Sequence, residues 1–336
     1  MARSGRTRTW LPWVLVGLVV LSFWGALVVG PVTVPVRDAI SGLFGGEVAS
    51  PIHRVIVQQL RAPRALLGLL VGAALAASGA AMQGLFRNPL ASPYVLGIAS
   101  GASTGAALVI LLATSSAALL PLGAFAGAAA AVGIVYALAR GRRGRTSIFV
   151  LILAGVAVGA LFSAITSFLL YLSSGGEKLA DVLFWIMGGL SRATWTSVGI
   201  LAPIVVLGIG LILLFARDLN ALALGEEGAS HVGVRPERLY RWLLLLTTAL
   251  TAAAVAMAGT IGFIGLVIPH VTRLLVGPDH RRLVPTAALA GGCFLVWSDA
   301  VARTAFAPAE LPVGVITAFL GAPFFLYLLR TRGANL

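Results

Sequence analysis

The sequence predicts an all-α polytopic membrane protein with about ten transmembrane helices. Hydrophobic residues make up 59% of the chain and charged residues only 10%, and the mean hydropathy is +1.00. A soluble protein of 336 residues must cover a large solvated surface and needs more charge than this. The 40 glycines fit helices that pack closely in a lipid bilayer, where small residues let backbones approach.

Apolar segments recur along the whole chain. Crossing the hydrocarbon core takes roughly 20 apolar residues in a helix. We expect spans near residues 11–30, 52–86, 95–113, 119–139, 147–171, 197–215, 239–258, 262–276, 283–304 and 312–329. The first is expected to be a retained span rather than a signal peptide, because Gly30-Pro31 is a weak cleavage signal.

Two of these spans have unusual proline and glycine content. The second opens at Pro51, a favourable position for a first helical turn, and crosses Pro63, where we expect a kink. The eighth is short and contains Gly262, Gly265 and Pro269. We therefore expect a broken helix there that does not cross the bilayer completely.

The basic residues predict the topology. Twenty-three of the 24 are Arg, and they gather in short loops such as Arg3 to Arg8 and Arg140 to Arg145. With ten spans, seventeen fall on one side and seven on the other. The positive-inside rule then predicts a multi-pass protein of the cytoplasmic membrane with both termini in the cytoplasm. Because topology accounts for the basic excess, no nucleic-acid partner is expected.

A faint internal repeat suggests two halves. The pattern Ala73-Ala74-x-Ala76-x-x-Gly79 reappears as Ala253-Ala254-x-Ala256-x-x-Gly259. Two halves of five spans each, about 11–171 and 197–330, would be inverted relative to one another within a single transmembrane domain, 1–336. Chance recurrence of alanine and glycine explains this match as well as homology does.

The charged residues bear on the energy source. Of the eleven acidic residues, Asp299 lies inside an apolar run, with Arg303 as its i+4 neighbour. An ion-coupled carrier usually places a carboxylate or histidine in mid-membrane, so its absence argues against that class. The one lysine, Lys178, lies in no nucleotide-binding P-loop. Active transport would need a separate ATPase, and a passive pore stays open as an alternative.

Several blocks of sequence resemble the FecCD family of ABC importer permeases. They run in the family's order from about residue 55 to 330 and are Arg61-Ala-Pro-Arg64, Met82-Gln-Gly-Leu-Phe-Arg-Asn-Pro-Leu90, Leu96-Gly-Ile-Ala-Ser-Gly101, Gly259-Thr-Ile-Gly-Phe-Ile-Gly-Leu-Val-Ile-Pro-His270, Gly277-Pro-Asp-His280 and Glu310-Leu-Pro-Val-Gly314.

The resemblance implies a type II ABC importer permease, a non-catalytic subunit that forms a homodimer. It implies cytoplasmic ATPase subunits as partners, and a substrate-binding protein on the other side. The cargo that we expect is an iron chelate, a ferric siderophore, with haem or cobalamin as alternatives. The binding protein largely selects the cargo, so the permease sequence does not identify it.

Three arginines run against the positive-inside trend at the outer ends of their spans: Arg61, Arg64 and Arg303. In the family that the chain resembles, arginines at these motif positions dock carboxylates of the binding protein, a contact that suits the guanidinium group. The alternative is a local role, such as snorkelling or pairing of Arg303 with Asp299.

A polar stretch of about 217–241 is the longest on the predicted cytoplasmic side. Its apolar residues predict two short helices that turn at Gly225 or Gly228 and present a surface to a partner. The resemblance makes this the loop that couples to the ATPase, through Leu222, Leu224, Gly225, Glu226, Ala229 and Val232. The alternative is a loop packed on its own bundle.

Small hydroxyl residues of the third and fifth spans are candidates for the translocation pathway. They are Ser100, Ser103, Thr104, Ser163, Thr166 and Ser167. Helix packing uses the same residues in lipid, and this alternative is equally open. The stretch 175–192 is expected to form an outer amphipathic helix. No spacing among the four histidines resembles a metal site, and no cofactor is expected.

Overall fold

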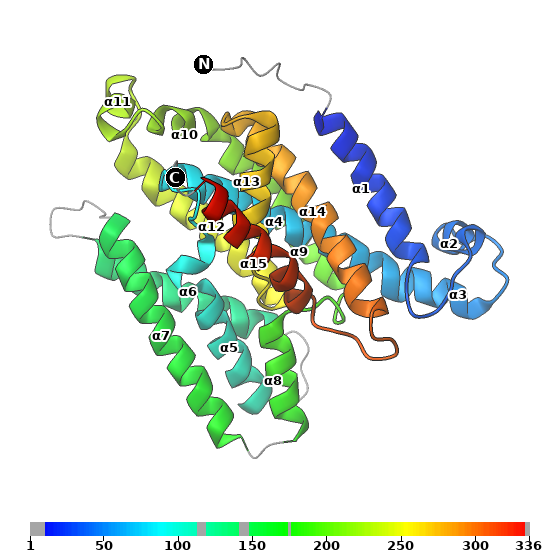
Figure 1. Cartoon of the computed structure of the whole chain (residues 1–336). Coiled ribbons are helices and arrows are strands. Elements are labelled where there is room, and N and C mark those ends of the chain that lie inside the picture. Colours follow the sequence, from blue (N-terminus) through cyan, green and yellow to red (C-terminus); the bar gives the residue numbers. More distant parts are fainter. Residues whose placement is uncertain (1–10, 113–118, 141–147, 174–175, 333–336) are drawn as a thin grey trace.

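The computed structural model describes residues 11–112, 119–140, 148–173 and 176–332, which form helices and connecting turns without a β-strand (Figure 1). Arg3, Arg6, Arg8, Arg142, Arg143 and Arg145, which entered the charge count, lie outside these ranges. The helices are α1 (Leu11–Val28), α2 (Val36–Leu43), α3 (Pro51–Val55), η1 (Ile56–Arg61), α4 (Ala62–Leu85), η2 (Pro93–Leu96), α5 (Ile98–Leu112), α6 (Leu119–Ala139), α7 (Ile148–Leu172), α8 (Glu177–Met187), α9 (Trp195–Leu214), α10 (Ala216–Leu222), α11 (Glu226–His231), α12 (Pro236–Ala258), α13 (Ile264–Val276), α14 (His280–Thr304) and α15 (Val313–Arg332).

The ten predicted spans correspond to ten apolar helical segments of the described chain. Six are long and apolar enough to cross a bilayer: Pro51–Leu85, Leu119–Ala139, Ile148–Leu172, Trp195–Leu214, Pro236–Ala258 and His280–Thr304. Four shorter apolar helices complete the set: Trp13–Val28, Ile98–Leu112, Ile264–Val276 and Val313–Tyr327. The all-helical fold class is confirmed.

The expected irregularities have structural counterparts. In the second span, Pro63 lies in the first turn of α4, and the π-helical turn η1 precedes it, with Ala62 N donating to the carbonyl of Val57. Proline crowds the carbonyl four residues before it, and the wider turn relieves this crowding. The eighth span is only 13 residues long, and Phe263, at its start, has a left-handed backbone with φ +66°.

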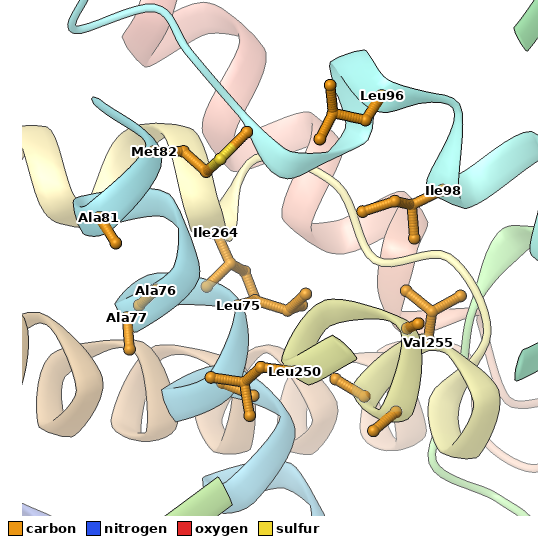
Figure 2. Packing of buried hydrophobic residues seen from close by; sticks show 14 of the residues in the cluster. Leu75, Ala76, Ala77, Ala81, Met82, Leu96, Ile98, Leu250, Val255 and Ile264 are labelled. Atoms are coloured by element: carbon orange, nitrogen blue, oxygen red, sulfur yellow. The ribbon is translucent and has the colours of Figure 1, made fainter. Parts of the chain in front are cut away.

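Helix α4 lies at the centre of the bundle and packs on α9, α12, α13 and α14. Figure 2 shows Leu75 and Ala76 of α4 gathered with Leu250 and Val255 of α12 and with Ile264 of α13. Glycines allow the closest approaches. A Cβ at Gly79 would overlap the carbonyl oxygen of Gly265, and one at Gly72 would overlap that of Gly291. These contacts hold the middle of α4 against α13 and α14.

The ends of the bundle carry different elements. In Figure 1 the beginning of α1, the described end of α15 and the pair α10–α11 lie on one side. Helices α2, α3 and α8 lie on the opposite side. The expected amphipathic helix at 175–192 is α8, and it stands with α5 at this second end.

Candidate functional site

Arg61 holds the end of the first helix. Its side chain is buried, with 4% of the residue exposed. Nη1 donates to the carbonyl oxygens of Leu27 and Val28, at 2.8 Å each, and Nη2 donates to that of Val32. The last carbonyls of a helix have no partner within it, so this guanidinium satisfies the end of α1.

Arg303 reaches the same helix from α14. It is as buried as Arg61, and its Nη2 donates to the carbonyl oxygen of Ala26 at 2.7 Å. Its Nε lies 3.7 Å from Oδ2 of Asp299, so the expected i+4 ion pair forms but is longer than a hydrogen bond. Two of the three candidate docking arginines therefore act on α1 within the chain.

Arg64 binds two carboxylates, those of Asp299 and Glu310. Its Nε and Nη2 donate to Asp299, with the shortest distance 2.9 Å to Oδ1, and its Nη1 donates to Glu310 at 3.0 Å. This is the planar, multiple contact that suits a guanidinium group. Neither the Arg64–Asp299 pair nor the role of Glu310 was predicted from the sequence. Asp299 inside an apolar run was the available signal, but the partner comes from a helix 235 positions away.

The structure thus brings Arg61, Arg64 and Arg303 together with two carboxylates in one buried cluster. Three cationic groups face two anionic groups, which leaves one positive charge in excess. The side chain of Glu310 is the most accessible member of the ion pairs, with 33% exposed, and that of Arg64 keeps 12%. A carboxylate from outside would meet Arg64 and Glu310 first. Docking of a binding protein stays a prediction, in which Asp299 and Glu310 compete for Arg64.

The segment between α9 and α12 forms two short helices, α10 and α11, that turn at Gly225 (φ +94°). Of the residues expected at its surface, Leu224 is 70% exposed and Val232 is 62% exposed, and Glu226 and Gly225 lie at the turn. The expectation that Leu222 and Ala229 face a partner is wrong, because both are fully buried in the bundle. Glu226 accepts a hydrogen bond from the Tyr240 hydroxyl at 2.9 Å, which fixes α11 on α12.

A hollow of about 450 Å³ opens beside η2, α5 and α7. Ser100, Ser103 and Ser163 line it, together with Thr260 and several glycines. Thr104 and Thr166 do not line the hollow: their hydroxyls bond to one another at 2.7 Å in a buried contact that joins α5 to α7. Ser167 lies one turn beyond Ser163 and is exposed on α7.

Tyr94 completes the hollow and was missed in the sequence. Its hydroxyl donates to the carbonyl oxygen of Ile261 at 2.9 Å and so links η2 to the turn before α13. Burial raises the pKa of Tyr94, which keeps the phenol protonated as a donor. No group of three or more His, Cys, Asp or Glu that could hold a metal ion occurs in the part of the chain that the structure describes.

Comparison with known proteins gives concordant results. The profile of the FecCD transport family matches residues 18–331. The cobalamin import system permease protein BtuC of Halobacterium salinarum is 49% identical, over 83% of this chain and 74% of that protein. The hemin transport system permease protein HmuU of Yersinia pestis is 42% identical, over 81% and 83%. The Fe(3+)-citrate import system permease protein YfmD of Bacillus subtilis is 39% identical, over 92% and 91%.

A solved structure supports the same conclusion. A protein described as a metal-chelate type ABC transporter, in an inward-facing conformation, superposes with a TM-score of 0.85. The two chains are 33% identical, and the superposition covers 95% of this chain and 98% of that one. The match of the family profile extends over nearly the whole bundle, from α1 to α15. The chain therefore belongs to the FecCD transport family and is a membrane permease of an ABC importer.

Proposed function

We propose that this permease carries an iron chelate, a ferric siderophore, across the cytoplasmic membrane. The observation that carries the proposal is the chemistry of the hollow beside α5 and α7, whose described lining contains hydroxyls and glycines but no His, Cys or carboxylate. A chelate whose iron is already fully coordinated needs space and hydrogen-bond partners rather than a ligand from the protein. Such a lining also lets the cargo leave, as transport requires.

Cobalamin is the second candidate. The 49% identity to a cobalamin import permease favours it, and its metal also arrives within its own macrocycle. Haem is the third cargo, supported by the 42% identity to a hemin transport permease. The described lining has no His or Cys, and the phenol of Tyr94 donates its hydrogen bond to Ile261, so the hollow fits haem least well among the three.

Transport by the assembled importer separates the three cargoes. The permease is reconstituted in proteoliposomes with its ATPase, and uptake is measured with binding proteins loaded with ferric siderophore, haem or cyanocobalamin in turn. The proposal expects ATP-dependent uptake of radioactive iron from the siderophore complex. ATP-dependent uptake of cyanocobalamin or haem alone would overturn the cargo and keep the importer. Uptake without ATP, driven by an ion gradient, would overturn the importer class itself.

The assembly that we propose places partners at both ends. ATP hydrolysis belongs to a separate ATPase pair, which would meet α10–α11 on the cytoplasmic side through Leu224 and Val232. The binding protein would dock on the opposite side, at the cluster around Arg64. Both ends of the chain would then be cytoplasmic, which is supported by the beginning of α1 and the described end of α15, which lie on the side of α10–α11 in Figure 1.

We also propose a homodimer, with the pathway between the two copies, and one transmembrane domain made of two inverted halves, 11–171 and 197–330. The relatives' description as permease proteins of import systems supports an assembly of several subunits. In this arrangement each copy would contribute its own Ser100, Ser103 and Ser163 to the pathway.

A further inference from the structure

A second hollow opens on the side of α10–α11, where α4, α10 and α13 end and α14 begins. Its volume is about 600 Å³. Its polar lining includes Gln83, Arg87, Asn220, Arg273, Asp279 and His280. None of these residues belongs to the arginine cluster or to the hollow beside α5. The four elements that meet here join the central helix to the proposed ATPase contact.

Two guanidinium groups face this hollow with unused hydrogen-bond donors. Arg273 donates from Nη2 to Gln83 Oε1 at 3.2 Å, while its Nε is buried without a hydrogen bond among the described residues. Arg87 is exposed at its rim. Because this Nε is enclosed by the protein, an acceptor in the hollow would meet the other donors of the Arg273 guanidinium group.

The acidic residue in the lining is already engaged. Asp279 Oδ1 accepts from Asn220 Nδ2 at 2.6 Å and from the backbone N–H of Arg281 at 3.1 Å, and so caps α14. Burial opposes its ionisation, but these hydrogen bonds and the neighbouring arginines keep the pKa of Asp279 below its usual value. The Asp279 carboxylate therefore interacts with the start of α14, and the guanidinium groups of Arg87 and Arg273 stay available to bind an anion.

We propose that this hollow binds a phosphate group, supplied by an anionic lipid headgroup or by free phosphate. Phosphate oxygens accept paired hydrogen bonds from guanidinium groups, and a tetrahedral anion can use Arg87 and Arg273 together. Basic pockets between transmembrane helices on the cytoplasmic side are typical sites for anionic headgroups. The hollow has the position, the charge and the volume that such a group requires.

The backbone at Arg87 follows from its place directly after the end of α4. Its positive φ of +49° is common at the C-terminus of a helix, where its N–H donates to the carbonyl oxygen of Gly84. Its Nη1 lies 3.7 Å from the place that a Cβ on Gly225 would occupy. A phosphate held by Arg87 and Arg273 would thus connect the ends of α4 and α13 with the turn between α10 and α11.

Binding to the full-length chain in neutral detergent tests the proposal. Short-chain phosphatidylglycerol, the matching diacylglycerol without phosphate, and inorganic phosphate are titrated separately, and dissociation constants are measured by native mass spectrometry and thermophoresis. Phosphatidylglycerol or phosphate should bind and diacylglycerol should not. Arg273→Gln and Arg87→Gln should each weaken binding about tenfold or more, since each removes a charge-assisted hydrogen bond.

Arg282→Gln is the matched control, because Arg282 is an exposed arginine near the same end of α14 that does not line the hollow. It should change the dissociation constant by less than about twofold. Phosphatidylglycerol binding that inorganic phosphate does not displace identifies a lipid source; displacement identifies free phosphate. Equal losses in Arg282→Gln and Arg273→Gln, or no binding above diacylglycerol, overturn the proposal. If Arg273→Gln does not fold, the dissociation constant of Arg87→Gln, a variant of an exposed residue, decides whether the proposal holds.

Discussion

At the scale of single residues, Asp38 and His53 fasten α2 to α3 on the proposed outer side. Asp38 Oδ2 accepts from His53 Nδ1 at 2.5 Å and from the backbone N–H of Ala49 at 3.2 Å. The hydrogen bond from His53 is the largest cause of a pKa of Asp38 below its usual value. A carboxyl whose pKa is lower in the folded than in the unfolded chain contributes stability above its unfolded pKa.

This contribution should be lost as the pH falls below about 4, through the pKa of the folded chain. We expect the thermal midpoint of the purified permease to fall over this range. Asp38→Asn should have a lower midpoint at pH 7 and a smaller further loss on acidification. Thermal unfolding in detergent at a series of pH values measures both effects. An identical acid profile in the variant would show that Asp38 is not the responsible group.

At the scale of helices, close packing of α4 on α13 depends on Gly79. An added methyl group there would overlap the carbonyl oxygen of Gly265, whereas one at Gly133 of α6 meets nothing within 4 Å. Gly79→Ala should therefore destabilise the chain by about 1–3 kcal/mol through overpacking. Gly133→Ala makes the same chemical change within a helix and should be neutral or slightly stabilising. The unfolding midpoints of the two variants are measured in detergent. Equal midpoints for Gly79→Ala and Gly133→Ala would contradict the packing argument.

The exposed residues of the loop formed by α10 and α11 are where we expect the ATPase to bind. Single cysteines at Leu224 and Val232, which are exposed, should cross-link to the ATPase in the assembled importer. A cysteine at Ala229, which is fully buried in the same loop, should cross-link far less and serves as the matched control. Cross-linked product is measured by gel electrophoresis with and without the ATPase. Equal yields at Leu224 and Ala229 would argue against a contact through the exposed residues.

The helical elements could be predicted from the sequence because length and hydropathy dominate the choice of a span in lipid. A turn at Gly225 or Gly228 was also predicted, and it lies at Gly225, where glycine accommodates the φ of +94°. Burial of Leu222 and Ala229 could not be predicted, because helices of seven and six residues are too short for an apolar face to show as a period. The contacts of Arg64 depend on how α4 and α14 approach each other, which no local pattern specifies.

At the scale of the whole molecule, the arginine cluster connects the first helix, the central helix and α14 beneath the proposed docking surface. Arg61 and Arg303 bind carbonyl oxygens at the end of α1, and Arg64 forms ion pairs with Asp299 and Glu310. A variant of any one arginine therefore perturbs both the fold and the surface charge. A test of docking must separate these two effects, and the cluster offers a way to do so through Asp299.

Arg64→Gln leaves two carboxylates without their main partner, and these should repel the carboxylates of a binding protein. We expect a loss of docking affinity of about 2 kcal/mol or more, together with a loss of stability. The double variant Arg64→Gln, Asp299→Asn removes both charges of the buried pair and should recover most of the stability. If the charge of Arg64 recognises the partner, docking of the double variant stays weak.

Arg192→Gln is the control: it changes an exposed ion pair on the same side and should leave docking unchanged. Interferometry measures the docking affinity of each variant, and thermal unfolding measures its stability. Full recovery of affinity in the double variant would assign Arg64 to the fold alone.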